Sequence, residues 1–172
     1  MKVLYPGSFD PITLGHVDII ERLVRLDYDV TVLVAHSSRK QTLFTSDERV
    51  ALIQEDLENH FKRRKSDSFL SMIKIEKFEG MTSDYMKMNS IRLIVRGLRA
   101  VSDYEYEMTM AQVNRKLYSE AETLFMPASP EFHFVSSRGV KEIAINGGAL
   151  DHFVSEPIRK ALVKRLSERS MK

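Results

Sequence analysis

Apolar stretches with the spacing of strands alternate along this chain with stretches that have the spacing of helices, and this alternation constrains the fold most. Strands are predicted at Val3–Tyr5, Val30–Ala35, Met72–Phe78, Ile91–Arg96 and Thr123–Met126. A helical segment follows each of them, and a further helix comes last. The order β-α-β-α-β-α-β-α-β-α-α requires right-handed crossovers, which produce a parallel sheet with helices on both faces. The predicted fold class is therefore α/β, with a sheet of about five parallel strands.

Local signals at the helix ends refine this outline. A helix is expected from His16 to about Leu26. Thr45-Ser46-Asp47-Glu48 and Ser102-Asp103-Tyr104-Glu105 have the pattern of capping boxes, and the second would open a helix to about Leu117. The other local predictions are a short helix at Gly80–Asn89, a helix capped by Ser136 or Ser137, a last helix opened by Ser155-Glu156-Pro157, an exposed loop at Lys62–Lys65, and core positions for Met81, Met86 and Met88.

Composition and charge exclude several classes of protein. The 172 residues suit one domain, 1–172, and contents of 43% hydrophobic and 29% charged residues are ordinary for a globular protein. A net charge of +2 argues against a dedicated nucleic-acid-binding protein. The lack of cysteine excludes disulfides, thiolate metal sites and cysteine nucleophiles. Neither a signal peptide nor an apolar run of membrane length is found, so we expect a cytoplasmic protein that binds neither nucleic acid nor membrane.

The turn after the first strand, Gly7-Ser8-Phe9-Asp10-Pro11-Ile12-Thr13-Leu14-Gly15-His16, has the chemistry of a phosphate site. Gly7 lets a phosphate approach the backbone, and the Ser8 hydroxyl and backbone N–H groups can donate to it. His16 puts a ring nitrogen at the start of a helix, whose positive end attracts anions. The full string favours this interpretation over a structural turn with a surface histidine.

Two more polar segments follow later strands at the same edge of the predicted sheet. Arg96-Gly97-Leu98-Arg99 carries two guanidiniums, which could bind phosphate or pair with nearby carboxylates. Ser136-Ser137-Arg138 opens a helix, and its serines could cap the helix, donate to an anion, or do both. Lys40 could reach a phosphate or be a solvated loop residue. Glu107 could accept from a base or ribose or simply form an ion pair.

Other familiar catalytic patterns are missing from the sequence. It has no nucleophile elbow of the kind that carries the serine of a Ser/His/Asp triad, and no Walker-type Gly-Lys-Ser/Thr phosphate-binding loop. His36, His60, His133 and His152 lack the spacing of metal ligands, so no metal site built by the protein is predicted.

Several of these segments together resemble one known family. The Gly7–His16 turn resembles the signature of the nucleotidyltransferase superfamily. Arg96–Met108, Phe134–Glu142 and Phe44-Thr45-x-x-Glu48-Arg49-Val50 narrow the likeness to the bacterial phosphopantetheine adenylyltransferases. The fold that this resemblance implies is the Rossmann-like nucleotidyltransferase fold.

Enzymes of that family transfer the adenylyl group of ATP to 4′-phosphopantetheine, giving dephospho-coenzyme A and pyrophosphate. They use Mg2+ bound with the ATP phosphates, and they are typically cytoplasmic homohexamers. The resemblance implies that His16 stabilises the transition state. It also implies ATP contacts from Ser8, Phe9, His16, Gly97, Leu98, Arg99, Glu107, Phe132, His133, Phe134, Val135, Ser136, Ser137 and Arg138, and phosphopantetheine contacts from Ser8, Lys40, Thr82 and Arg96. Because the acceptor brings its own phosphate oxygen as nucleophile, we expect in-line attack without a protein nucleophile.

Parts of the sequence are also compatible with four other functions. Nicotinate-mononucleotide adenylyltransferases and cytidylyltransferases share the first turn, but the Arg96–Met108 segment speaks against both. A non-catalytic nucleotide sensor would bind ATP without releasing pyrophosphate. An RNA-binding protein would use Lys62–Lys65 and the basic stretch Arg159–Lys172, which the near-neutral net charge disfavours.

Overall fold

The computed structural model describes residues 1–35 and 42–170, and its centre is a parallel sheet. Its strands are β1 (Lys2–Gly7), β2 (Asp29–Ala35), β3 (Ile73–Phe78), β4 (Leu93–Leu98) and β5 (Glu122–Pro127). They lie in the order β3-β2-β1-β4-β5, and every pairing is parallel. The predicted α/β class and the five-stranded sheet are therefore confirmed.

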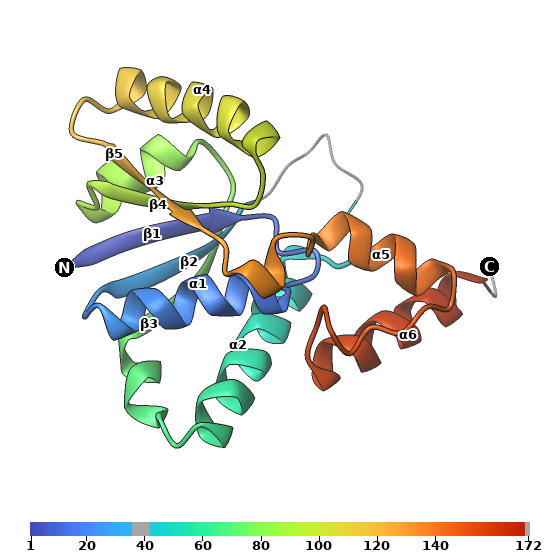
Figure 1. Ribbon diagram of the computed structural model, residues 1–172. Coiled ribbons are helices and arrows are strands. Elements are labelled where there is room, and N and C mark those ends of the chain that lie inside the picture. Colours follow the sequence, from blue (N-terminus) through green and yellow to red (C-terminus); the bar gives the residue numbers. More distant parts are fainter. Residues whose placement is uncertain (36–41, 171–172) are drawn as a thin grey trace.

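Six α-helices connect and flank the strands among the described residues. They are α1 (Leu14–Arg25), α2 (Ser46–Arg63), α3 (Thr82–Asn89), α4 (Val101–Leu117), α5 (Ser137–Ile145) and α6 (Glu156–Ser170), with short 3-10 turns at Asp67–Met72 and Pro130–Phe132. Figure 1 shows α1 and α2 on one face of the sheet, α3 and α4 on the other, and α5 and α6 beside the edge where the strands end. Within residues 1–35 and 42–170, no helix has the length and apolar character to cross a bilayer.

Alternating side chains of the central strands build a core on each face. Val3 and Val32 face α1 and α2, where they join Ile20 and Phe61 in the larger core. Leu4, Leu33 and Ile94 point the other way and pack with Tyr85 and Met86 of α3. Strands that are apolar on both faces are what a parallel sheet covered by two helical layers requires.

The helix starts agree with the sequence at some positions and differ at others. The Thr45–Glu48 capping box forms, with the Thr45 N–H donating to the Glu48 carboxylate over 2.8 Å. Ser136 caps α5 by accepting from the Gly139 N–H. The capping box predicted at Ser102–Glu105 was wrong, because α4 begins at Val101 and its N-cap is Ala100. The carboxylate of Asp103 instead accepts hydrogen bonds from the backbone N–H and the guanidinium of Arg99.

Two other local predictions were wrong. Lys62 and Arg63 belong to the last turn of α2, not to a loop, because the helix continues to Arg63. Of the three methionines placed in the core, Met86 is buried, but Met81 and Met88 are exposed. Met81 is the N-cap of the eight-residue helix α3 and Met88 lies on its outer side, so neither faces the sheet.

Helix α4 buries polar side chains and exposes apolar ones. Its buried residues are Glu107 and Asn114, whereas Val101, Tyr106 and Leu117 are 84%, 65% and 43% exposed. A helix of this kind is held in place by polar contacts more than by an apolar stripe.

Glu21 joins α1 to α2 through a partly buried charge cluster. Its carboxylate lies 2.6 Å from Arg25, 2.7 Å from His60 and 3.0 Å from Arg64. Burial by itself raises the pKa of Glu21, but the bonds to His60 and Arg25 and the charge of Arg64 outweigh it, so the pKa lies below the ordinary 4.5.

Replacing Glu21 with glutamine should lower the free energy of unfolding at neutral pH by about 1–3 kcal/mol, since three partners lose their carboxylate. A carboxyl group with a lowered pKa stabilises the fold fully above its unfolded pKa, and this contribution is lost as the pH falls through the folded value. The difference between wild type and Glu21→Gln should therefore shrink in acid, as measured by urea unfolding. Glu55→Gln, an exposed change on α2, is the control; a difference that stays constant down to acid pH would contradict the assignment.

Candidate functional site

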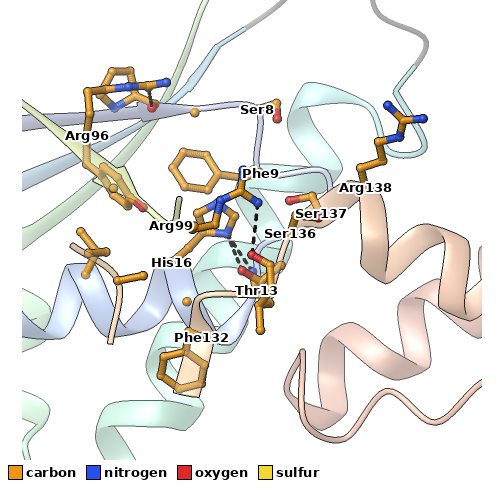
Figure 2. Close-up of a pocket in the computed structure, with 18 of the residues that line it drawn as sticks. Ser8, Phe9, Thr13, His16, Arg96, Arg99, Phe132, Ser136, Ser137 and Arg138 are labelled. Atoms are coloured by element: carbon orange, nitrogen blue, oxygen red, sulfur yellow. Dashed lines mark hydrogen bonds between the residues drawn. The ribbon is translucent and has the colours of Figure 1, made fainter. Parts of the chain in front are cut away.

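A cavity of about 370 Å³ opens at the carboxyl ends of β1 and β4, where ligands of parallel α/β sheets bind. Three parts of the chain form it: the turn after β1 with the start of α1, the end of β4 with one residue of α4, and the segment between β5 and α5 (Figure 2). Its lining comprises Tyr5, Pro6, Gly7, Ser8, Phe9, Thr13, Gly15, His16, Ile19, Arg96, Gly97, Arg99, Glu107, Ala128, Phe132, Val135, Ser136, Ser137 and Arg138.

His16 is held in one orientation at the N-terminus of α1. Its Nδ1 accepts a hydrogen bond from the backbone N–H of Thr13 over 3.0 Å, and the Thr13 hydroxyl lies 2.9 Å from the same nitrogen (Figure 2). The ring packs edge to face against Phe9, with centroids 5.0 Å apart, and near Tyr5. An Nδ1 that accepts from a backbone N–H carries no proton, so in the neutral ring the proton sits on Nε2.

The surroundings of His16 favour this neutral form. Its enclosure by neighbouring side chains, together with the positive charges of Arg99 and Arg96, lowers its pKa to about 4. At neutral pH the ring is therefore an uncharged Nε2–H donor, not an imidazolium.

Two arginines put positive charge beside the His16 ring. Arg96 donates to both carboxylate oxygens of Glu107, each over 2.6 Å, and to the carbonyl of Pro6. Burial lowers the pKa of Arg96, but its bonds to Glu107 outweigh that effect and raise the pKa above its ordinary value. Arg99 donates to Asp103 and to the Val135 carbonyl. Each guanidinium is thus already paired with a carboxylate of α4.

The N-terminus of α5 closes the pocket on a third side. The Ser137 hydroxyl donates to the Pro11 carbonyl over 2.8 Å, which ties this helix to the turn after β1. Arg138 projects into solvent at the rim and pairs with Glu142 one turn later. A helix N-terminus with serine hydroxyls and an arginine provides donors for an anionic group.

A second cavity, of about 270 Å³, adjoins the first one behind Ser8. Both are lined by Pro6, Gly7, Ser8, Arg96 and Glu107. The second cavity then extends between the ends of the strands and α4, where its lining includes Ala35, Thr82, Tyr106, Met110 and Asn114. The arrangement offers two binding spaces that meet at one hydroxyl and one guanidinium.

The structure brings most of the predicted site residues together. The first cavity is lined by Ser8, Phe9, His16, Gly97, Arg99, Glu107, Phe132, Val135, Ser136, Ser137 and Arg138, and the second by Ser8, Arg96 and Thr82. Leu98, His133 and Phe134 line neither. His133 Nε2 lies 2.8 Å from the Ala128 carbonyl, and Phe134 is exposed and packs on Phe153. Lys40 lies outside the described residues.

Some residues of the site were not singled out from the sequence. Thr13 fixes His16, and the buried Asp10 accepts from Lys141 of α5 over 2.7 Å. Buried Arg49 donates to the carbonyls of Ser8 and Ala35. Asp10 and Thr13 lie within the Gly7–His16 string and Arg49 follows the first capping box, so the motifs contained them. The contacts of Asp10 and Arg49 are long-range, and that of Thr13, although local, is made by its backbone N–H.

The sequence and the fold were compared with those of known proteins. The family described as cytidylyltransferase-like matches residues 4–143. The chain is 53% identical to the phosphopantetheine adenylyltransferase of Bdellovibrio bacteriovorus over 95% of this chain and 96% of that one. It is 45% identical to the enzyme of the same name from Thermotoga neapolitana over 98% of both chains.

Among solved structures, the fold matches the nicotinic acid mononucleotide adenylyltransferase of Plasmodium falciparum. The complexes with APC and with NaAD superpose with TM-scores of 0.64 and 0.61, each over 98% of this chain and 95% of that one. The identities are 13% and 14%, so this likeness establishes the fold alone.

The His16 ring should remain neutral from about pH 5.5 to 8, with its titration midpoint near pH 4. Nitrogen-15 NMR of histidine-labelled protein should show an unprotonated Nδ1 and a protonated Nε2 over that range. The urea-unfolded chain, in which histidine has its ordinary pKa of about 6.5, is the reference. A His16 signal that titrates near 6.5 in the folded protein would rule out the neutral donor.

Proposed function

The chain belongs to the cytidylyltransferase-like family and, within it, to the phosphopantetheine adenylyltransferases, and we propose that its two joined cavities carry out that reaction. ATP occupies the larger cavity and 4′-phosphopantetheine the smaller one. The acceptor's phosphate oxygen attacks the α-phosphorus of ATP, an O–P bond forms, and the bond to pyrophosphate breaks. The products are dephospho-coenzyme A, a precursor of coenzyme A, and pyrophosphate. The observation that carries this proposal is the meeting of the cavities at Ser8 and Arg96, beside His16.

His16 acts as a neutral hydrogen-bond donor in this mechanism. Its Nδ1 is occupied by Thr13, so Nε2–H is the hydrogen that remains for an oxygen of the α-phosphate. Negative charge on that oxygen increases as the attacking oxygen approaches, and a fixed donor stabilises it without rearrangement. The acceptor supplies the nucleophile, so positioning and charge stabilisation are the protein's whole task.

The donors around the larger cavity suit the phosphates of ATP. Arg99 and the N-terminus of α5, with Ser136, Ser137 and Arg138, offer positive charge and N–H groups. Gly97 has no side chain to occupy the cavity at the end of β4. A Cβ at this position would lie 3.6 Å from the Tyr5 hydroxyl and would fill part of that space.

The smaller cavity suits the acceptor. Arg96 and Ser8 stand at its junction with the ATP cavity, where the acceptor's phosphate has to lie for in-line attack. Thr82, Met110 and Asn114 line the part that extends away, which offers mixed polar and apolar contacts to a pantetheine arm.

Mg2+ enters this scheme as part of the substrate. In residues 1–35 and 42–170 there is no group of three or more His, Asp or Glu side chains that could hold a metal ion. Glu107, the carboxylate among the described lining residues, is engaged by Arg96. This donor set suits an ion carried in on the ATP phosphates, where it would supply positive charge beside them.

The other candidate functions have less support. The Plasmodium falciparum structures share the fold at 13–14% identity, far below the 53% and 45% of the two phosphopantetheine adenylyltransferases. The basic run Lys62–Lys65 that RNA binding would use begins in the last turn of α2, at the opposite end of that helix from the pocket.

Purified protein should release pyrophosphate and form dephospho-coenzyme A from ATP, Mg2+ and 4′-phosphopantetheine, but not when nicotinate mononucleotide replaces the acceptor. His16→Ala should lower kcat by about 10²–10³-fold with little change in the KM for ATP, because the lost bond acts mainly in the transition state. His152→Ala, a change at an exposed histidine, is the control. Binding of ATP without pyrophosphate release would favour a nucleotide sensor, and unchanged turnover of His16→Ala would remove that residue from the mechanism.

We also propose that the enzyme is a homohexamer and works in the cytoplasm, where ATP is at hand. The exposed apolar residues of α4, with Leu124 of β5, support burial against other copies. Light scattering should give six times the 19.9 kDa mass of the chain. Leu117→Glu should reduce this mass, whereas Val163→Glu, at an exposed position on α6, should not. A monomeric wild-type protein would contradict the proposal.

A further inference from the structure

The ion pair between Arg96 and Glu107 stands at the boundary of the two cavities. Nε and Nη2 of Arg96 each lie 2.6 Å from one oxygen of Glu107, so the carboxylate fills the Nε/Nη2 edge of the guanidinium, one of its two edges that present parallel N–H groups. Nη1 donates to the Pro6 carbonyl. The side chains of Arg96 and Glu107 are only 28% and 11% exposed. The pair is thus a two-bond contact largely shielded from water.

A phosphate that binds this edge of Arg96 has to displace Glu107. Guanidinium groups bind phosphate and carboxylate alike through two parallel N–H···O bonds. While Glu107 occupies those two donors, Arg96 has no second parallel pair on that side, and the carboxylate's charge repels an incoming phosphate dianion. In the empty pocket Glu107 therefore stands where the acceptor's phosphate would bind.

We propose that Glu107 is an internal competitor for the acceptor's phosphate, and that ATP removes this competition by engaging Glu107 and freeing Arg96. The inference rests on the proposed function, because it takes ATP and 4′-phosphopantetheine as the two substrates. It makes Glu107 a positioning residue that couples the two substrates, in addition to any contact with ATP. Binding of either substrate then strengthens binding of the other by the same factor.

The placement of Glu107 explains why ATP is the partner that releases it. Glu107 lines both cavities, so its carboxylate can be reached from the ATP side while Arg96 stays at the junction. An ionised carboxylate only accepts hydrogen bonds, and the hydroxyl groups of a ribose are suitable donors. Each hydrogen bond that ATP donates to Glu107 takes up lone-pair density of its carboxylate oxygens, which weakens their bonds to Arg96 and favours turning the carboxylate toward the nucleotide.

The neighbouring pair, Arg99 with Asp103, lacks this arrangement. Asp103 also accepts from the backbone N–H of Arg99, which fixes the carboxylate to the start of α4. Neither residue lines the smaller cavity, and the Arg99 side chain is 40% exposed. The exchange of partners is therefore specific to Arg96 and Glu107.

Calorimetric titration tests the coupling in the wild-type protein. 4′-Phosphopantetheine is titrated with and without a saturating ATP analogue that has a methylene group between its α- and β-phosphates and cannot transfer the adenylyl group. The analogue should tighten binding of 4′-phosphopantetheine by about tenfold, within the range of roughly 5- to 150-fold that coupled sites usually show. Pantetheine, which lacks the phosphate, should gain little.

Glu107→Gln tests the residue itself. This variant should bind 4′-phosphopantetheine about tenfold more tightly than wild type in the absence of nucleotide, and the analogue should then add little. Glu105→Gln removes the same charge from an exposed position on α4 and should behave like wild type.

The outcomes separate this inference from the function on which it rests. If the wild type makes dephospho-coenzyme A but the analogue does not tighten acceptor binding, or tightens pantetheine equally, the competition does not exist. Weaker or unchanged acceptor binding by Glu107→Gln would also overturn it, since Glu107 would then support Arg96 and not compete for it. If the wild type neither binds 4′-phosphopantetheine nor releases pyrophosphate, it is the proposed function that fails.

Discussion

The buried carboxylate of Asp10 holds the walls of the site together. Only 3% of this residue is exposed, and it accepts from the backbone N–H groups of Leu43 and Phe44, each over 2.9 Å, and from Lys141 over 2.7 Å. Three segments therefore converge on one side chain: the turn after β1, the approach to α2, and helix α5. Removing it would leave two buried N–H groups and a partly buried ammonium without their acceptor, at a desolvation cost.

Arg49 complements this contact from the other side of the turn. Arg49 is 1% exposed, and its guanidinium donates to the carbonyl of Ser8, which lines the pocket, and to that of Ala35, the last residue of β2. It also donates to the Ser46 hydroxyl at the start of α2. With Asp10 and Arg49 both buried, the turn after β1 is tied to α2 and α5 before any substrate binds. Such preorganisation is what a reaction driven by positioning requires.

Much of this could be predicted from the sequence because the signals are local. The spacing of apolar residues predicts the strands and helices, and hence the layers of the fold. The polar segments of the site lie at or after the ends of β1, β4 and β5 in the chain, which places them at one edge of the sheet: Gly7–His16, Arg96–Arg99 and Ser136–Arg138. The contacts that join them are not local: Asp10 and Lys141 are 131 positions apart. The tautomer of His16 depends on a backbone N–H, which no residue type reveals. At the start of α4, Asp103 belongs to the capping box that the sequence pattern predicted, but its carboxylate accepts hydrogen bonds from Arg99 instead.

Positions at the two edges of the parallel sheet differ in how directly they affect the site. Among the described residues, the strands end and the helices that follow them begin at the edge with the pocket, whereas the connections from helices back to strands lie at the opposite edge. The end of α2 and the 3-10 turn Asp67–Met72 lie on that distant side (Figure 1). Residues can be gained, lost or recharged there without altering the distance between nucleotide and acceptor. In the run Lys62–Lys65, Arg64 is tied to Glu21 of α1, so charge can change at the other three positions without moving the site. A single insertion after β1 or β4 would instead move the reacting groups.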